Sequence, residues 1–206
     1  MRRSSRAVAL TGLLVLAPLP SLAQVPAQVV PPPGDSGASD RPLDLQLVGG
    51  LQGFTAGLAA GTAVGPLLGV AMLWRPFFLL GVELRYEGGR LPIDDVRLPE
   101  GEALWSHAAL GLVKLGLPVT DALSPFVGTG LGVGYLQPSR GARDLYARDI
   151  LVELPWVLGV EAHAGRLSGG AHVSYRSVLG ESFDRTGLGD ASGGRVTVGL
   201  SLGARF

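Results

Sequence analysis

The residues best suited to chemistry stand near the end of the chain, where His172 and Ser174 are separated by one residue. A histidine can act as general base toward a serine hydroxyl, and a carboxylate such as Glu161 can orient the histidine; acyl hydrolysis uses this arrangement. Residues two apart on a β-strand share a face, so His172 and Ser174 should point the same way. Neighbouring His and Ser on one face of a strand also arise by chance, so a hydrolase and a purely structural pair are both open.

Other charged residues also recur at every second position, as Glu83, Arg85 and Glu87 do. A strand places such residues together on one face. Buried charges must be paired, so this face predicts either a network of salt bridges and hydrogen bonds or a narrow polar path. The predicted set is Glu83, Arg85, Glu87, Glu161, His163, His172, Arg176 and Arg205.

The remaining motifs exclude several kinds of site. The chain has no Cys, which removes disulfides and cysteine metal sites. It contains no P-loop, HExxH motif, dinucleotide-binding glycine pattern or recognition helix, so we expect no cofactor and no metal. The segment with Asp94, Asp95, Glu100 and Glu102 is acidic; it predicts a solvated loop, with contact to divalent cations or lipopolysaccharide as the alternative.

The last twelve residues show which element positions these side chains. Between Arg195 and Phe206 every even position is apolar, and every odd position is small or polar. This period of two predicts a strand with one apolar and one polar face. Its length of about ten residues is what a tilted strand needs to cross the hydrocarbon core of a membrane.

The same alternation recurs along the chain and predicts eight strands, an even number as in single-chain bacterial barrels. The fold class is therefore all-β, an antiparallel up-and-down transmembrane barrel spanning 43–206. The expected strands are about 43–55, 65–74, 77–87, 103–117, 126–136, 150–164, 170–178 and 195–206. Turns after Trp74, Leu117 and Ala164 are short, whereas most other connections are long and polar. Short turns belong on the periplasmic side, which places both ends of the barrel there as well.

The fourth strand is the least regular. If Leu110 and Leu112 face lipid, Lys114 faces lipid too; if Lys114 faces inward, so do both leucines. A β-bulge between Ala108 and Val113 would reconcile the two ends. The rival interpretation is that Lys114 extends its amine toward the membrane edge.

Aromatic residues provide a second argument for a membrane barrel, because the predicted strands place them near both rims. Such girdles are typical of membrane interfaces. The girdle residues are Trp74, Phe78 and Phe206 at the periplasmic end, and Tyr86, Tyr135, Trp156 and Tyr175 toward the other end, where Trp105 also lies in one register. A soluble barrel with its apolar face inward is the alternative, and it would leave Glu83 and Arg85 outside.

One stretch conflicts with this interpretation. Residues 54–74 carry no charge, and Gly57, Gly61, Gly65 and Gly69 recur every four residues, as in a glycine-zipper transmembrane helix. Pro66 lies within the run, and a lone helix would not explain the other alternating segments. We therefore favour a glycine-rich hairpin.

The N-terminal segment has two parts. Residues 1–23 resemble a secretory signal peptide, with Arg2, Arg3 and Arg6 before an apolar run and a small-x-small site ending at Ala23. Residues 24–42 are rich in Pro, Ser and Gly and predict a disordered linker. Without the three arginines the chain has 14 basic and 17 acidic residues, which offers no basic footprint for nucleic acid.

These features resemble the outer-membrane β-barrel (OmpA-like, porin-family) domain over 43–206. The resemblance is carried by the eight alternating strands, by the Ala204–Arg205–Phe206 ending, and by the segment SPFVGTGLGVGY from Ser124 to Tyr135. It implies localisation in the outer membrane and a structural or surface role with limited passage of small solutes. It also implies outer-membrane lipid, lipopolysaccharide and the barrel-assembly machinery as partners, the last through the C-terminal strand.

Two alternative functions stay open. One is a narrow dedicated channel for an ion or an amphiphile. The other is a lipid A-modifying hydrolase, because His172-x-Ser174 is similar to the dyad of eight-stranded lipid A deacylases. The polar face of the strand, however, points both side chains into the lumen, away from an acyl chain. We therefore expect no enzyme.

Overall fold

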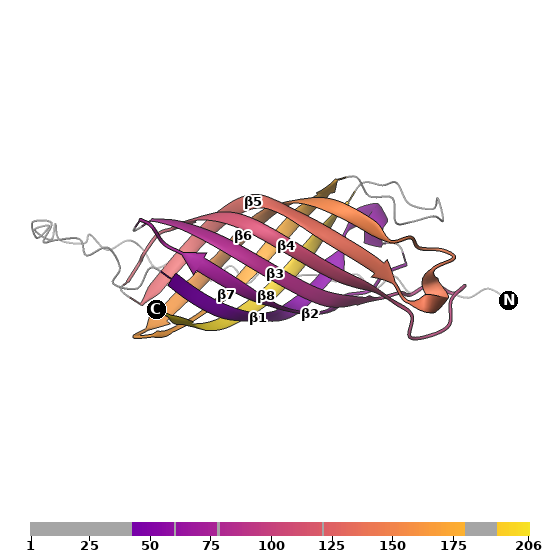
Figure 1. Ribbon diagram of the computed structural model, residues 1–206, viewed down its shortest axis with the longest axis horizontal. Coiled ribbons are helices and arrows are strands. Elements are labelled where there is room, and N and C mark those ends of the chain that lie inside the picture. The colour runs from indigo at the N-terminus through magenta and orange to yellow at the C-terminus, as the bar shows by residue number, and fades with distance from the viewer. Residues whose placement is uncertain (1–42, 60, 78, 121, 180–192) are drawn as a thin grey trace, which may run out of the picture. The chain divides into compact units, whose positions relative to one another are not determined.

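The computed structural model describes residues 43–59, 61–77, 79–120, 122–179 and 193–206. Eight strands form one closed antiparallel barrel in which each strand pairs with its neighbours in sequence (Figure 1). The strands are β1 Leu43–Phe54, β2 Gly65–Trp74, β3 Leu80–Pro92, β4 Ala103–Gly116, β5 Leu123–Pro138, β6 Asp149–Ala164, β7 Leu167–Leu179 and β8 Gly194–Arg205. Two short 3₁₀ helices, η1 Ala56–Ala59 and η2 Arg140–Ala142, lie in the connections.

The first and last strands close the barrel. β1 pairs with β8 in a continuous register from Asp44 opposite Arg205 to Phe54 opposite Arg195. Closure removes the open sheet edges that would otherwise expose unpaired backbone groups. The predicted eight-stranded up-and-down barrel is therefore confirmed.

The barrel is apolar outside and polar inside. Leu131 and Leu200 are 64% and 68% exposed, whereas Glu83 and Thr197 are completely buried. This polarity is the reverse of a soluble barrel, so the alternative of a soluble barrel with its apolar face inward is wrong. An outer wall of this kind is stable only against hydrocarbon.

The connections also follow the predicted order. The β2–β3, β4–β5 and β6–β7 turns lie at the same end as the start of β1 and the end of β8 (Figure 1). The β3–β4 and β5–β6 connections and η1 lie at the opposite end, which we call the outer end.

β4 resolves the ambiguity of the fourth strand. Its pairing with β3 and β5 is continuous, without the bulge we expected as one solution. Lys114, Leu110 and Leu112 are all buried inside, and Trp105 is exposed outside. The register with Lys114 and both leucines inward is therefore the observed one, and the bulge and the lysine extended toward the membrane edge were wrong.

The glycine-rich stretch is a hairpin and not a helix. η1 is followed by β2, whose Leu68, Val70, Met72 and Trp74 are exposed as the alternation predicts. Within the described ranges, no helix is long and apolar enough to span a membrane.

The strand ends differ from the predicted ones by a few residues. β3 begins at Leu80 and continues to Pro92, and β5 and β7 are longer at both ends. The predicted signal peptide 1–23, the linker 24–42 and Phe78 lie outside the described residues.

Candidate functional site

Ion pairs fill the lumen, beginning at the end with the short turns. Arg75 bridges Glu161 and Asp44, with its Nη1 3.8 Å from Asp44 Oδ2. The Lys114 amine lies 3.0 Å from Glu161 Oε1 and also contacts Glu83. Lys114 Nζ is also 4.2 Å from the centre of the Phe126 ring, a cation–π contact. Each cation here therefore serves two acceptors.

The network continues toward the outer end. Arg85 lies 2.6 Å from Glu83 Oε1 and 3.3 Å from Glu87 Oε1. Arg176 connects Glu87 to Glu153, with its Nη1 3.3 Å from Glu153 Oε2, and the network ends where Arg195 contacts Glu153. The charge ladder, as we call these residues, is Asp44, Glu83, Glu87, Glu153 and Glu161 with Arg75, Arg85, Lys114, Arg176 and Arg195. Five acids balance five bases, so the ladder carries no net formal charge.

Most of the predicted lumenal residues lie in this ladder or against it. Buried inside are Glu83, Arg85, Glu87, Glu161, His172 and Arg176, while His163 and Arg205 are half-buried near the end with the short turns. The prediction did not include Asp44, Arg75, Lys114, Glu153 and Arg195 as lumenal charges. Glu153 and Arg195 lie within the predicted strands 150–164 and 195–206 and share the inward parity of Glu161 and Thr197. Applying the alternation to every residue of these strands would have found them.

His172 and Ser174 point into the lumen, where each contacts a different partner. The His172 Nε2 lies 2.8 Å from Arg85 Nη1. The Ser174 hydroxyl lies 2.6 Å from that of Thr197 and accepts a hydrogen bond from Arg176. Both residues are buried, each beside a different partner, and away from the lipid that a deacylase must reach.

Glycines on β5 make room for the bulky side chains. The inward Gly128, Gly130, Gly132 and Gly134 are paired across β4–β5 with Lys114, Leu112, Leu110 and Ala108. A Cβ added to Gly134 would lie 2.7 Å from Glu153 Oε1, and one added to Gly132 would collide with Leu110. The glycine stripe therefore accommodates large neighbours.

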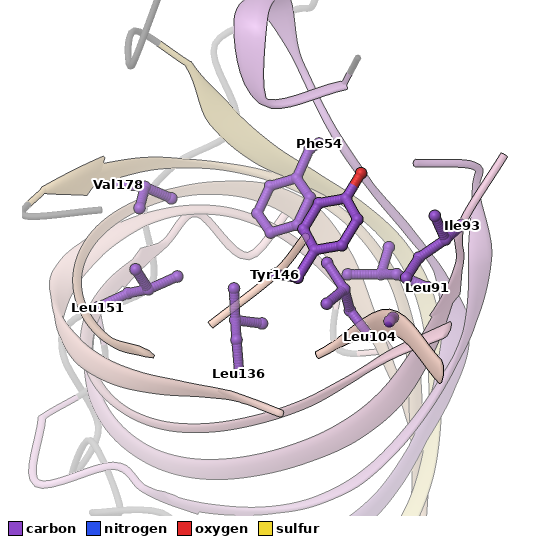
Figure 2. Close-up of a cluster of buried hydrophobic side chains, with 9 residues drawn as sticks. Phe54, Leu91, Ile93, Leu104, Leu136, Tyr146, Leu151 and Val178 are labelled. Atoms are coloured by element: carbon purple, nitrogen blue, oxygen red, sulfur yellow. The ribbon is translucent and has the colours of Figure 1, made fainter. Parts of the chain in front are cut away.

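An apolar cluster closes the outer end of the lumen above the ladder. Figure 2 shows these side chains pointing into the ring of strands. Tyr146, from the segment after η2, and Phe54, from the end of β1, supply its two aromatic rings. We call this cluster the plug; it contains Phe54, Leu91, Ile93, Leu104, Leu136, Ala142, Tyr146, Leu151 and Val178.

A second apolar layer lies on the inward faces of the adjacent strands β4, β5 and β6 and consists of Leu112, Phe126 and Val157. A pocket opens at the end with the short turns, lined by Arg75, Lys114, Phe126 and Glu161 among others. Phe126 belongs to both the layer and the pocket wall. The pocket thus ends against packed side chains.

The predicted girdle residues that the structure describes have side chains on the outer wall, most of them exposed. Trp74 and Phe206 are exposed at the end with the short turns. Tyr86, Trp156 and Tyr175 are exposed further toward the outer end, and Tyr135 is half-buried there. Trp105 is also exposed, nearer the outer rim.

The acidic β3–β4 loop is partly neutralised by its neighbours. Arg97 donates to both carboxylate oxygens of Asp95, and these hydrogen bonds lower the pKa of Asp95 to about 2. Glu102 accepts a hydrogen bond from the Ser139 hydroxyl. In the part of the chain that the structure describes, no three His, Asp or Glu side chains form a group that could hold a metal ion.

Comparisons with known proteins identify the fold but no family. No protein-family model and no curated protein match the sequence. Among solved structures, the chain is similar to neisserial surface protein A, with a TM-score of 0.60 and 11% identity over 80% of this chain and 97% of that one.

Two further structures give the same result. The N-terminal β-barrel domain of OprF from Pseudomonas aeruginosa matches with a TM-score of 0.53 and 13% identity, over 81% of this chain and 98% of that one. Ail, the attachment invasion locus protein of Yersinia pestis, matches with a TM-score of 0.51 and 11% identity, over 80% and 97%. The closed eight-stranded sheet, its apolar outer wall and these neighbours together identify the chain as a small integral β-barrel of the bacterial outer membrane.

Proposed function

We propose that this protein is a non-enzymatic barrel with a structural or surface role, and that its filled lumen permits at most limited passage of small solutes. The observation that carries the proposal is the combined filling of the lumen by the charge ladder and the plug. An eight-stranded barrel has an interior just wide enough for side chains. Here the side chains occupy it from Asp44 at one end to Tyr146 at the other.

A dedicated channel for an ion or an amphiphile is less compatible with this interior. A conducting path needs polar surface along its whole length, and an apolar constriction resists wetting. The plug places apolar side chains across the outer mouth, and Leu112, Phe126 and Val157 form a second apolar layer.

Conductance of the purified protein in a planar lipid bilayer tests the proposal. We expect silence, or rare and brief openings, since the ion pairs and the plug have to move before an ion can pass. Stable unitary currents from the wild-type protein would contradict the proposal and favour the dedicated channel.

The absence of enzymatic activity is tested separately. Because His172 contacts Arg85 and Ser174 contacts Thr197, we expect purified protein to release no fatty acid from lipid A. Release that disappears in both His172→Ala and Ser174→Ala would favour the hydrolase alternative.

Two kinds of partner belong to this proposal. The exposed apolar wall requires outer-membrane lipid, and the outer loops would contact lipopolysaccharide. The barrel-assembly machinery would read the C-terminal strand, where Val198, Leu200, Leu202 and Phe206 form one apolar face. Refolding assisted by that machinery should slow when Phe206 is removed, and an unchanged rate would contradict this partner.

A further inference from the structure

Two polar side chains on the outer wall mark where the hydrocarbon ends. Tyr86 on β3 and His107 on β4 are both exposed, their rings stack, and the Tyr86 hydroxyl lies 2.8 Å from His107 Nδ1. On the membrane side of this pair the outward positions of the neighbouring strands are apolar, among them Leu84, Val113 and Val133. A polar pair on a lipid-facing wall is least costly at the interface, so Tyr86 and His107 lie at the level where headgroups begin.

A second row of side chains lies one step further out on the same wall. Arg90 on β3 pairs with Trp105 on β4, and Trp105 pairs with Gln137 on β5. The β5–β6 register ends with Leu136 opposite Asp149, and Arg148 directly precedes β6, one residue beyond that last pair. We call Arg90, Trp105, Gln137 and Arg148 the outer row. Two residues along a strand correspond to roughly 7 Å, which places the outer row in the headgroup layer.

The outer row carries a positive charge at each end. Neighbouring strands are about 4.8 Å apart, so Arg90 and Arg148 are separated by roughly 14 Å across three strand spacings. Trp105, with 48% exposure, and the amide of Gln137 lie between them. The row therefore presents cation, aromatic ring, amide and cation in order along the membrane surface.

Arg90 and Arg148 differ in their local contacts. Arg90 donates one hydrogen bond from Nη2 to the Gly101 carbonyl at 2.8 Å, which fixes the guanidinium against the β3–β4 loop. Arg148 is exposed and follows the outward parity of Ile150. Of the nearby acids, Asp95 is paired with Arg97, Glu102 accepts from Ser139, and Asp149, next to Arg148, accepts from the Ile150 backbone amide. Asp94, Glu100 and Asp144 are exposed.

We propose that the outer row binds the headgroup of a bisphosphorylated glycolipid of the outer leaflet. Each arginine would hold one phosphate by charge-assisted hydrogen bonds, and Trp105 and Gln137 would pack against and hydrogen-bond the sugars between them. This inference deepens the lipopolysaccharide contact of the proposed function and rests on its orientation, in which the outer end faces the outer leaflet.

The experiment measures binding of bisphosphorylated lipid A to the full-length protein in phosphatidylcholine vesicles, using Trp fluorescence and co-purification as two readouts. Lipid A whose phosphates have been removed serves as the ligand control. We expect the double variant Arg90→Gln, Arg148→Gln to bind at least about ten-fold more weakly, since the loss of a charge-assisted hydrogen bond costs enough for such a change.

The matched control is the double variant Arg140→Gln, Arg143→Gln. It removes the same charge from the segment whose Ala142 and Tyr146 cover the barrel mouth, and we expect little change in its binding. Equal weakening in both double variants would show diffuse electrostatic attraction and would overturn the site. Equal binding of the two lipids by the wild type would overturn it as well.

Folding of each variant is checked by the heat-dependent shift on SDS gels. Arg148 lies outside the strands, so Arg148→Gln alone repeats the test if the double variant does not fold. Bilayer conductance is recorded on the same samples. A conducting protein that binds lipid A at the outer row would contradict only the closed lumen, and a silent protein without preference for phosphates would contradict only the site.

Discussion

Glu153 is completely buried and carries two of the ion pairs of the ladder. Arg176 and Arg195 both contact its carboxylate, and all three side chains are almost completely buried. A buried charge that loses its partner is strongly unfavourable, while an intact pair contributes less than its Coulomb attraction suggests. We therefore expect the complete ladder to be compatible with a stable fold, and the removal of any one charge to destabilise the protein.

The variant Glu153→Gln should therefore lower the free energy of unfolding by about 3–5 kcal/mol. Urea unfolding of the protein in lipid vesicles measures this change. Glu100→Gln, at an exposed loop position, is the matched control and should change stability little. A loss from Glu153→Gln no larger than from the control would show that the ladder is hydrated and weakly coupled.

Alternation in the sequence predicted which residues face the lumen, but it could not predict which of them form ion pairs with each other. Parity placed Glu83, Arg85, Glu87 and Arg176 inside. The contact between Arg176 and Glu87 spans two strands that are far apart in the chain, and it depends on the register of every strand between them. Parity alone does not determine that register.

At the scale of elements, β4 and β5 fit each other as a bulky strand and a glycine strand. Leu110, Leu112 and Lys114 point inward because the facing positions on β5 are glycines. The alternation predicted the inward and outward faces of most strands separately. The faces of β4 stayed ambiguous because its leucines were considered without the glycines opposite them on β5. The apolar inward face of β4 is thus a property of the pair.

The variant Gly132→Val tests this complementarity. The added side chain would collide with Leu110 inside the lumen, and overpacking of this kind typically costs about 1–3 kcal/mol. Leu131→Val, on the outward face of the same strand, should change stability little in lipid. Urea unfolding in vesicles compares the two, and equal stabilities would indicate free space beside Gly132.

The plug is the part of the structure that was hardest to predict from the sequence. Its members come from β1, β3, β4, β5, β6, β7 and the connections, and several were counted as polar-loop or strand-end residues. Tyr146 lies within a segment that carries four charged residues, so its burial could not be inferred from local composition.

Opening the plug should change conductance more than it changes the fold. The double variant Phe54→Ala, Tyr146→Ala removes both aromatic rings from the outer mouth, so we expect more frequent openings in planar bilayers than for the wild type. Val198→Ala together with Leu200→Ala, on the outer wall, is the control and should remain as silent as the wild type. If the plug variant is equally silent, the charge ladder alone closes the lumen.

For the whole molecule, the central feature is the reversal of inside and outside. The apolar wall, the neutral charge ladder and the closed sheet depend on each other, because lipid cannot hydrate a charge and an open edge cannot be satisfied in hydrocarbon. The terminal strand already shows this pattern in sequence, which is why the fold was predictable. The function is less predictable from the sequence. It depends on how the lumenal side chains pack against each other, and the alternation of polar and apolar residues does not determine that packing.

The most direct measurement uses the lack of native cysteine. Single cysteines placed in turn at positions 197 to 202 are labelled with a fluorophore, and quenching by nitroxide-bearing lipids is recorded in vesicles. We expect quenching with a period of two, strong at 198, 200 and 202 and weak at 197, 199 and 201. The opposite phase, or equal quenching at all six positions, would contradict a barrel that is apolar outside and polar inside.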